Sequence, residues 1–411
     1  MRRRLLALLS LGTATACRPP APPAPDPGRL VLLVSLDGFR PDYLDRPEAR
    51  RLRQLADSGV RAEYLAPAFP TKTFPNLYTI ATGLYPEHHG IVANTMVDSV
   101  LGRFTTADTV TNRKPGWWKG EPIWITAGRQ GRRTATMFWV GSEVAFDGRH
   151  ADHWRPFEPF LPGDARVDQL TEWLSLPEGE RPQFATLYLN RVDVMGHRHG
   201  PDSPAVDSAI AVTDSTVGRL VDWLTAAGLA PRTDLVIVSD HGMTGISPDR
   251  VIFLDDYVPI EPGDIVDLAP VTALEPAANR VETVSRKLQG AHPHLTVYRR
   301  EEMPARFHFR ANDRITSLVL LADDGWTIST RALWRDRPLR DDGNHGYDNA
   351  LPSMRATFLA VGPSFRRGAV VPPFQNIHVY DLLAHLLGVR PAPNDGSLDS
   401  VRAVLRNPGG R

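Results

Sequence analysis

The chain has 411 residues, of which 42% are hydrophobic and 23% charged, enough for the core of one large α/β domain or two smaller ones. Its 47 Lys and Arg residues balance 47 Asp and Glu residues, which argues against nucleic-acid binding as the main role. The only cysteine is Cys17, so a disulfide framework and thiolate metal sites are not expected.

Residues 1–17 predict an export signal. A basic start, Arg2–Arg4, precedes the apolar run Leu5–Leu11, which is too short to span a bilayer. Cys17 follows small residues, as in bacterial lipoprotein signals where the cysteine is acylated, although Ala14–Ala16 also fits ordinary cleavage to a soluble form. The Pro/Ala-rich stretch 18–28 predicts a stiff linker. We therefore expect a periplasmic, membrane-anchored lipoprotein with its catalytic domain at 29–405.

A buried strand and a helix entrance come next. Residues 30–36 form a continuous apolar run, typical of a strand buried on both faces, and Asp37 follows directly. A carboxylate just past such a strand lies where α/β folds place their sites, although a turn aspartate before Gly38 is an alternative. The turn 69–75 then carries Thr73 to a helix expected over 76–82, with Pro75 suited to its first position. Thr73 either caps this helix or serves as a nucleophile at a helix entrance that favours negative charge. Asn94, in the next turn, offers an amide donor to a phosphate oxygen or is simply a turn residue.

Two further apolar strands end in candidate ligands. The strand over 183–190 leads to Asp193 and His197, which lie four residues apart and therefore on one face of a helix. The strand beginning at 235 ends in Asp240 and His241. Carboxylate and imidazole ligands without thiols suit zinc.

The last third of the chain is less regular up to residue 341. We expect residues 247–341 to form an inserted subdomain that partly covers the site. His345 follows in a Gly-rich turn, and a strand over 356–361 with a helix over 379–387 completes the core. The predicted fold is α/β, with a mostly parallel sheet flanked by helices.

The candidate ligands are too numerous for one tetrahedral zinc and suit two: Asp37, Asp193, His197, Asp240, His241 and His345, plus the Thr73 oxygen. Two metals can clamp the attacking and leaving oxygens of a phosphoryl transfer. The residues thus predict a bimetallic phosphoesterase with a threonine nucleophile.

Five motifs together resemble the nucleotide pyrophosphatase/phosphodiesterase family of the alkaline phosphatase superfamily. They are Leu36-Asp37-Gly38, Lys72-Thr73-Phe74-Pro75-Asn76, Asp193 with Gly196-His197, Asp240-His241-Gly242 and Gly343-Asn344-His345-Gly346. The similarity extends from about residue 29 to about residue 387. Without the cysteine-rich and nuclease-like domains of larger animal members, the chain looks like a compact catalytic unit of an alkaline phosphatase-like fold.

The resemblance implies a role for each residue. One Zn²⁺ would be held by Asp193, His197 and His345, and a second by Asp37, Asp240 and His241 with the Thr73 oxygen. Asn94 and the Thr73 amide would bind a nonbridging phosphate oxygen, while Phe74 and Tyr188 would line a nucleobase slot. The substrate would be a small nucleotide or another phosphodiester, hydrolysed through a covalent phospho-threonine.

Three alternatives remain open at this stage. A phosphomonoesterase would need a cation beside the nucleophile to bind the second nonbridging oxygen, whereas this turn has the apolar Phe74 there. A phosphodiesterase acting on lipid headgroups would use the same residues. A lipoprotein that binds zinc or nucleotide without turnover is a more remote alternative. No protein partner is expected.

Overall fold

The computed structural model describes residues 28–268, 270–336 and 341–406. The predicted signal and almost all of the linker therefore lie outside the described residues, as does the predicted acylation at Cys17. Within the described part of the chain, no helix is both long and apolar enough to cross a bilayer.

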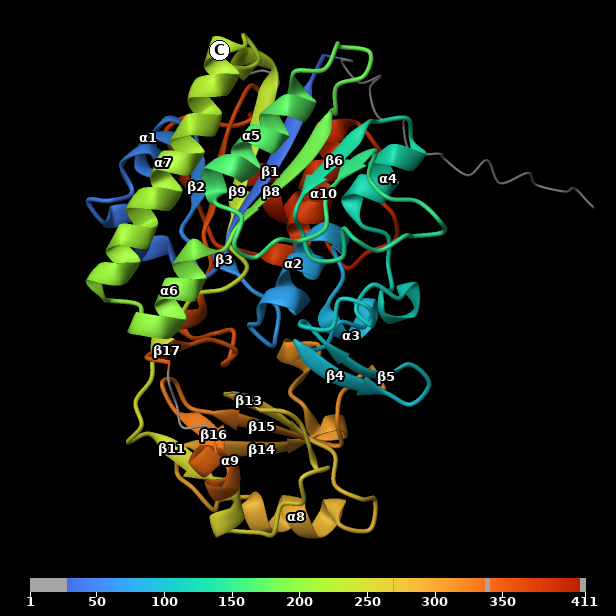
Figure 1. Ribbon diagram of the computed structural model, residues 1–411, viewed down its shortest axis with the longest axis vertical. Coiled ribbons are helices and arrows are strands. Elements are labelled where there is room, and N and C mark those ends of the chain that lie inside the picture. Colours follow the sequence, from blue (N-terminus) through green and yellow to red (C-terminus); the bar gives the residue numbers. More distant parts are fainter. Residues whose placement is uncertain (1–27, 269, 337–340, 407–411) are drawn as a thin grey trace, which may run out of the picture.

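A large mixed sheet forms the centre of the upper lobe in Figure 1. Its described strands lie in the order β19 (Ala369–Val371), β2 (Val60–Ala62), β18 (Phe358–Val361), β9 (Thr233–Val238), β1 (Leu30–Leu36), β8 (Phe184–Leu189), β6 (Thr134–Met137) and β7 (His153–Trp154). All neighbouring pairs are parallel except those of β18, which is antiparallel to β9 and β2. Strands β9, β1 and β8 are adjacent and parallel, so their carboxyl ends meet at one edge.

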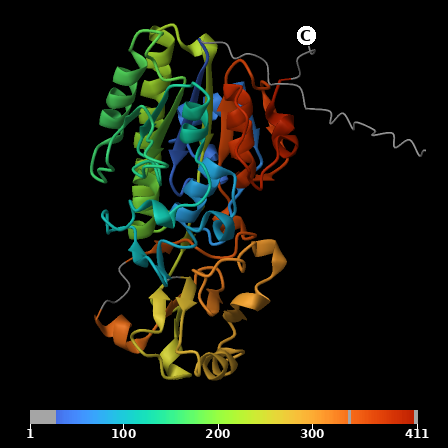
Figure 2. The same cartoon turned by 90° about the vertical axis from the view of Figure 1, so that its right-hand side faces the viewer.

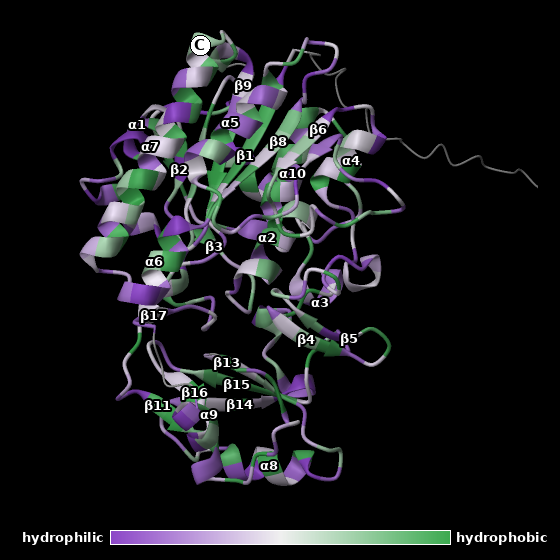
Figure 3. Ribbon diagram, viewed as in Figure 1, coloured by the Kyte–Doolittle hydropathy of each residue, from purple (hydrophilic) through white to green (hydrophobic). Residues whose placement is uncertain are grey.

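Helices cover both faces of this sheet, as Figure 2 shows. Three pack on one face, α1 (Arg50–Ser58), α5 (Gly163–Leu174) and α7 (Pro204–Ala226), and three on the other, α2 (Thr73–Thr82), α4 (Ile123–Arg129) and α10 (Val379–Leu387). Every residue of β1, β8 and β9 is buried, and Figure 3 shows these strands as largely hydrophobic. The double covering explains why their sequences are continuous apolar runs rather than alternating ones.

The small lobe, defined here as residues 251–329, lies below the large sheet in Figure 1. Its antiparallel sheet has the order β12 (Ile265–Asp267), β13 (Val271–Leu274), β15 (Leu318–Ala322) and β14 (Leu295–Arg299), and α8 (Val281–Leu288) packs on it. A parallel pair, β11 (Val251–Phe253) and β16 (Thr327–Ser329), lies beside it, followed by α9 (Arg331–Asp336). The chain enters and leaves this region through the paired strands β10 (Thr244–Gly245) and β17 (Gly343–Asn344).

Short elements surround the carboxyl edge of the large sheet. They are the pair β3 (Leu65–Ala66) and β20 (Phe374–Gln375), the helix α3 (Pro86–His89), the hairpin β4 (Thr95–Asp98) and β5 (Gly102–Thr105), and the helix α6 (Arg191–His199).

One predicted boundary was wrong. The helix expected from residue 76 begins at Thr73, so Pro75 is its third residue rather than its first. The first four amides of a helix have no intrahelical partner, and a proline there costs no hydrogen bond. Strand β6 ends at Met137 because Phe138 has a positive φ of 58°, which a strand cannot accommodate.

Candidate metal centre and nucleophile

The carboxyl edge of the large sheet gathers the predicted site residues. Asp37 follows β1 directly, Asp240 and His241 follow β9, and α6 begins right after β8 and carries Asp193 and His197. His345 reaches the same place from the segment that returns from the small lobe. Six ligand candidates that are far apart in the sequence thus lie together.

Asp193, His197 and His345 form one group whose ligand atoms all lie within 4.8 Å of one another. Asp193 Oδ1 is 3.5 Å from His197 Nε2 and 3.6 Å from His345 Nε2. The i,i+4 spacing on α6 puts the first two on one face of the helix, as expected.

A second group within the same limit consists of Asp37, Asp193 and His241. His241 Nε2 lies 3.4 Å from Asp37 Oδ1 and 3.2 Å from Asp240 Oδ2. The rings of His241 and His345 stack with their centroids 3.6 Å apart. The two groups therefore adjoin and share Asp193, with Asp240 contacting the second group through His241.

Backbone carbonyls orient all three imidazoles in the same way. The Nδ1 atoms of His197, His241 and His345 lie 3.0, 2.9 and 2.8 Å from the carbonyl oxygens of Gly343, Gly242 and Thr71. A carbonyl only accepts hydrogen bonds, so each Nδ1 carries a proton, and in the neutral ring each Nε2 keeps its lone pair. This arrangement fixes the tautomer that a metal requires.

Within this cluster, three buried carboxylate oxygens have no hydrogen-bond partner: Asp37 Oδ1, Asp193 Oδ1 and Asp240 Oδ2. Burial, followed by the Asp240 and Asp193 carboxylates, raises the pKa of Asp37 well above its usual range. Burial also raises the pKa of Asp193, against the opposing effect of His197 and His241. Unpaired buried carboxylates beside imidazole lone pairs are a poor arrangement without a cation, and oxygen and nitrogen donors suit zinc. The residues present therefore fit a metal centre.

The pKa values of the two stacked histidines shift in opposite directions. Burial alone would lower the pKa of His241, but the carboxylates of Asp240 and Asp193 outweigh it, and the pKa rises. Burial, together with the neighbouring His241 and His197, lowers the pKa of His345 well below its usual range. His345 is therefore neutral, the form in which imidazole binds metals.

Thr73 is the first residue of α2, and its side chain does not cap the helix. The capping position is Lys72, which makes no side-chain cap hydrogen bond. Thr73 Oγ1 instead lies 3.1 Å from His241 Nε2, at the rim of the second group, and the residue is partly exposed. The hydroxyl thus combines a helix N-terminus, an adjacent ligand set and access from solvent.

Asn94 and Phe74 flank the nucleophile candidate. Asn94 Oδ1 accepts a hydrogen bond of 3.2 Å from the Phe74 backbone N–H, which brings the Asn94 amide beside the Thr73 turn. The half-buried Phe74 ring packs edge-on against Phe104, with centroids 5.9 Å apart, and tilts towards Trp118. An apolar wall therefore lies next to Thr73.

Tyr188 lies against the candidate ligand Asp37, and its expected place in a nucleobase slot stays a prediction. It is 9% exposed, and its hydroxyl donates a hydrogen bond to Asp37 Oδ2. Its ring lies against Phe157, which is 41% exposed. The structure thus gives Tyr188 a supporting role beside a carboxylate, and the accessible aromatic surface here belongs to Phe157.

Thr71 is a supporting residue that sequence reasoning missed. Its carbonyl accepts from His345 Nδ1, and its hydroxyl donates to the Tyr347 carbonyl and accepts from the Gly346 amide, both at 3.0 Å. These partners are more than 270 residues away in the chain, so no local spacing predicts the contact. Only its place two residues before Thr73 was a hint.

Comparison with known proteins agrees with this geometry. Residues 31–348 match the family described as type I phosphodiesterase / nucleotide pyrophosphatase. The chain is 38% identical to bis(5'-adenosyl)-triphosphatase ENPP4 of Bos taurus, over 98% of this chain and 87% of that protein. It is 37% identical to ectonucleotide pyrophosphatase/phosphodiesterase family member 3 of Rattus norvegicus, over 92% of this chain and 44% of that protein, so it spans under half of that relative.

A solved structure of murine ectonucleotide pyrophosphatase/phosphodiesterase 5, an inactive threonine-to-alanine variant in complex with AMP, has the same fold. It is similar with a TM-score of 0.87 and 37% identity, covering 92% of this chain and all of that chain. The expected alkaline phosphatase-like α/β fold is thereby confirmed. The chain belongs to the type I phosphodiesterase/nucleotide pyrophosphatase family.

Proposed function

We propose that this protein hydrolyses phosphodiester or pyrophosphate bonds in nucleotides and releases nucleoside 5'-monophosphates, with Thr73 as the nucleophile. The observation that carries the proposal is the 3.1 Å contact between Thr73 Oγ1 and His241 Nε2, at the edge of the carboxylate–imidazole cluster. The bovine relative is a bis(5'-adenosyl)-triphosphatase and the murine structure contains AMP, which together support a nucleotide substrate.

The ligand set fits two zinc ions. Asp193, His197 and His345 would hold one, and Asp37, Asp240 and His241, with the Thr73 oxygen, would hold the other. Bound zinc would supply positive charge that stabilises the attacking and leaving oxygens and lowers the pKa of a bound water.

The chain's own groups position the reaction. Thr73 Oγ1 bonds to phosphorus as its proton leaves to solvent, and the bond from phosphorus to the leaving oxygen breaks. The product is a 5'-nucleotidyl ester of Thr73, which water then hydrolyses to a nucleoside 5'-monophosphate and free Thr73. The Asn94 amide, beside the Thr73 turn, and the Thr73 backbone amide at the start of α2 would stabilise charge on a nonbridging oxygen.

Charge beside Thr73 favours diesters over monoesters. The only cation in the turn 69–76 is Lys72, and its ammonium lies 2.5 Å from Asp267 Oδ2, so it is already paired. A phosphomonoester carries an additional negative charge that this turn leaves uncompensated. The apolar Phe74 instead suits the body of a larger substrate.

A substrate panel on the zinc-loaded protein tests the proposal. ATP, dinucleotide polyphosphates and cyclic dinucleotides would be compared with a nucleoside monophosphate ester of p-nitrophenol, a simple phosphomonoester and glycerophosphocholine. We expect turnover of the nucleotides with release of 5'-monophosphates. Preference for the monoester or for glycerophosphocholine would contradict the proposal, and no turnover at all would favour a binding role.

We also propose export and membrane anchoring through acylated Cys17, from the pattern of residues 1–17. Replacing Cys17 with Ala should move the protein from the membrane to the soluble fraction on cell fractionation. An unchanged distribution would refute acylation.

A further inference from the structure

The small lobe reaches the nucleophile turn through one buried ion pair. Lys72 Nζ donates to Asp267 Oδ2 at 2.5 Å and to the Val271 carbonyl at 3.4 Å. The side chains of Lys72 and Asp267 are only 5% and 14% exposed. Lys72 is the residue immediately before Thr73, whereas Asp267 is the last residue of β12 in the small lobe.

The local backbone directs the side chains of Lys72 and Asp267 towards each other. The register of β12 against β13 shifts between Ile265 and Asp267, and such an irregularity re-aims a side chain. The Lys72 stem runs over Gly346, where a Cβ would lie only 3.3 Å from Lys72 Cε. Gly346 has a φ of 117° and follows the ligand His345, so Lys72 threads between a metal-ligand turn and the small lobe.

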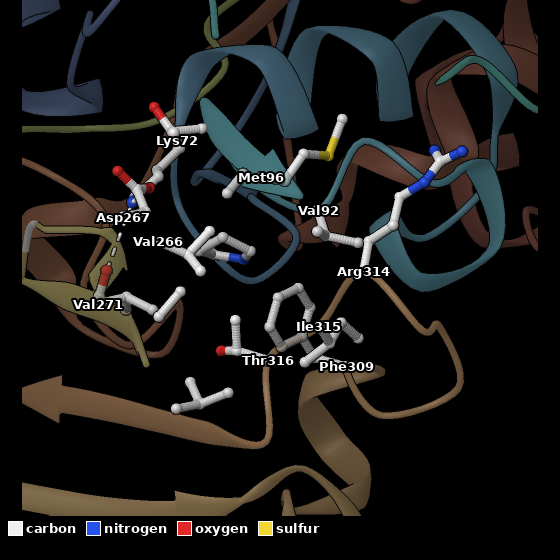
Figure 4. A pocket seen from close by; sticks show the side chains of 15 residues that line it. Lys72, Val92, Met96, Val266, Asp267, Val271, Phe309, Arg314, Ile315 and Thr316 are labelled. Atoms are coloured by element: carbon white, nitrogen blue, oxygen red, sulfur yellow. Dashed lines mark hydrogen bonds and ion pairs between the residues drawn. The ribbon is translucent and has the colours of Figure 1, made fainter. Parts of the chain in front are cut away.

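The surroundings make the pair strong. It borders a cavity of about 20 Å³, room for about one water molecule. Figure 4 shows Lys72 and Asp267 close together at one side of this cavity, with Val271 beside them. Its walls are mostly apolar, including Val92, Met96, Val266, Phe309 and Ile315. Low polarity strengthens the attraction and makes a lone charge there costly.

A second contact of the small lobe holds the loop that carries Asn94. Arg314, on the far side of the cavity in Figure 4, is 7% exposed. Its guanidinium donates to Asp98 Oδ2 at 2.8 Å and to the carbonyl oxygens of Gly90, Gly116 and Trp117. The small lobe therefore contacts both the turn that carries Thr73 and the segment that carries Asn94.

We propose that the Lys72–Asp267 pair is a positioning device, through which the small lobe holds Thr73 in the geometry needed for attack. The proposal rests on the proposed function of Thr73. The Lys72 ammonium is bound by Asp267 and the Val271 carbonyl, so the pair would act through the backbone at the start of α2. The Lys72 carbonyl accepts the first helical hydrogen bond, 3.1 Å from the Asn76 amide, so a shift of Lys72 moves the helix entrance itself.

The test compares Asp267→Asn and Lys72→Met with a matched control, Asp264→Asn. Asp264 is a buried carboxylate of the same lobe, paired with Arg280 at 3.0 Å, and no contact joins it to the Thr73 turn. We expect Asp267→Asn and Lys72→Met each to lower kcat on a p-nitrophenyl nucleotide by about 10- to 100-fold, the cost of a small misplacement, with KM and zinc content close to wild type. Asp264→Asn should keep kcat within about threefold.

Two further readouts separate positioning from general damage. Hydrogen exchange at the amides of Thr73, Phe74 and Asn76 should speed up in Asp267→Asn and stay unchanged in Asp264→Asn. The Lys72→Met/Asp267→Asn double variant should be no slower than the worse single variant, as expected for one coupled unit.

Any of three results would overturn the proposal. They are a wild-type kcat in Asp267→Asn, an equal loss of kcat in Asp267→Asn and Asp264→Asn, and losses of kcat that multiply in the double variant. Thr73→Ala keeps the two hypotheses apart. If Thr73→Ala retains turnover, the proposed function fails. If it is inactive while Asp267→Asn is normal in rate and exchange, only the positioning role fails.

Discussion

Replacing Tyr188 with Phe distinguishes a support for the metal centre from a wall of the substrate pocket. The change removes only the hydroxyl that donates to Asp37 Oδ2 and keeps the aromatic ring. Both groups are buried, and the other oxygen of Asp37 already lacks a hydrogen-bond partner. The variant therefore leaves the Asp37 carboxylate with no hydrogen bond from a side chain to orient it towards His241.

The expected magnitude follows from the charge of the acceptor. A hydrogen bond to a charged group is worth about 1.5–3 kcal/mol, and loss of a partner that orients a ligand typically weakens metal affinity about 10- to 100-fold. We expect zinc affinity, measured by competition with a chromogenic chelator, to fall within that range. At saturating zinc, KM for a nucleotide should change by less than about threefold.

Tyr43→Phe is the matched control, since the Tyr43 hydroxyl is also buried but donates to the uncharged Pro201 carbonyl at 3.3 Å. Its zinc affinity should match wild type. Unchanged zinc affinity in Tyr188→Phe, or a loss as large in the control, would refute the supporting role. A raised KM at saturating zinc would instead restore Tyr188 to the substrate pocket.

Three other outcomes are expected. Asn94→Ala should lower kcat about 10²- to 10³-fold without loss of zinc, and steady-state kinetics showing less than a threefold change would remove Asn94 from the reaction. Chelation of the metal should abolish turnover and lower the melting temperature, because burial of Asp37 and Asp193 beside each other disfavours their charged forms. A metal-free protein with the same melting temperature as the loaded one would contradict this. Burial lowers the pKa of His89 from 6.5 to about 3. Between these pH values the unfolded chain binds a proton at His89 and the folded protein does not, so the fold is fully stable above pH 6.5 and loses stability as the pH falls towards 3. Denaturant unfolding should therefore show about 2 kcal/mol lost between pH 6.5 and 5, and a slope that His89→Gln does not reduce would exclude His89 as its source.

Much of the site could be predicted because parallel strands bring their carboxyl ends together. Asp37 and Asp240 each follow a fully buried strand, and the spacing of Asp193 and His197 fits one face of a helix. These local signals are strong because a strand buried on both faces leaves a continuous apolar run. His345 was already a candidate ligand, but its grouping with Asp193 and His197 came from the family resemblance, since a Gly-rich turn alone does not say where it folds.

The remaining features depend on contacts that the sequence does not record. A strand buried on both faces gives no sign of which side chain contacts a metal ligand, so the hydrogen bond from the Tyr188 hydroxyl to Asp37 was not predicted. Lys72 and Asp267 are 195 residues apart, and nothing near either one indicates the other. The early start of α2 also escaped prediction, because a proline is tolerated throughout the first turn and does not fix the first residue.

The most direct measurement of the central claim is to trap the covalent intermediate. The zinc-loaded protein would be mixed with a p-nitrophenyl nucleotide, quenched in acid within milliseconds and digested for mass spectrometry. The account predicts a 5'-nucleotidyl group on Thr73 in the wild type and none in Thr73→Ala, which should keep its zinc but lose turnover. Turnover by Thr73→Ala, or a nucleotidyl group on another residue, would contradict it.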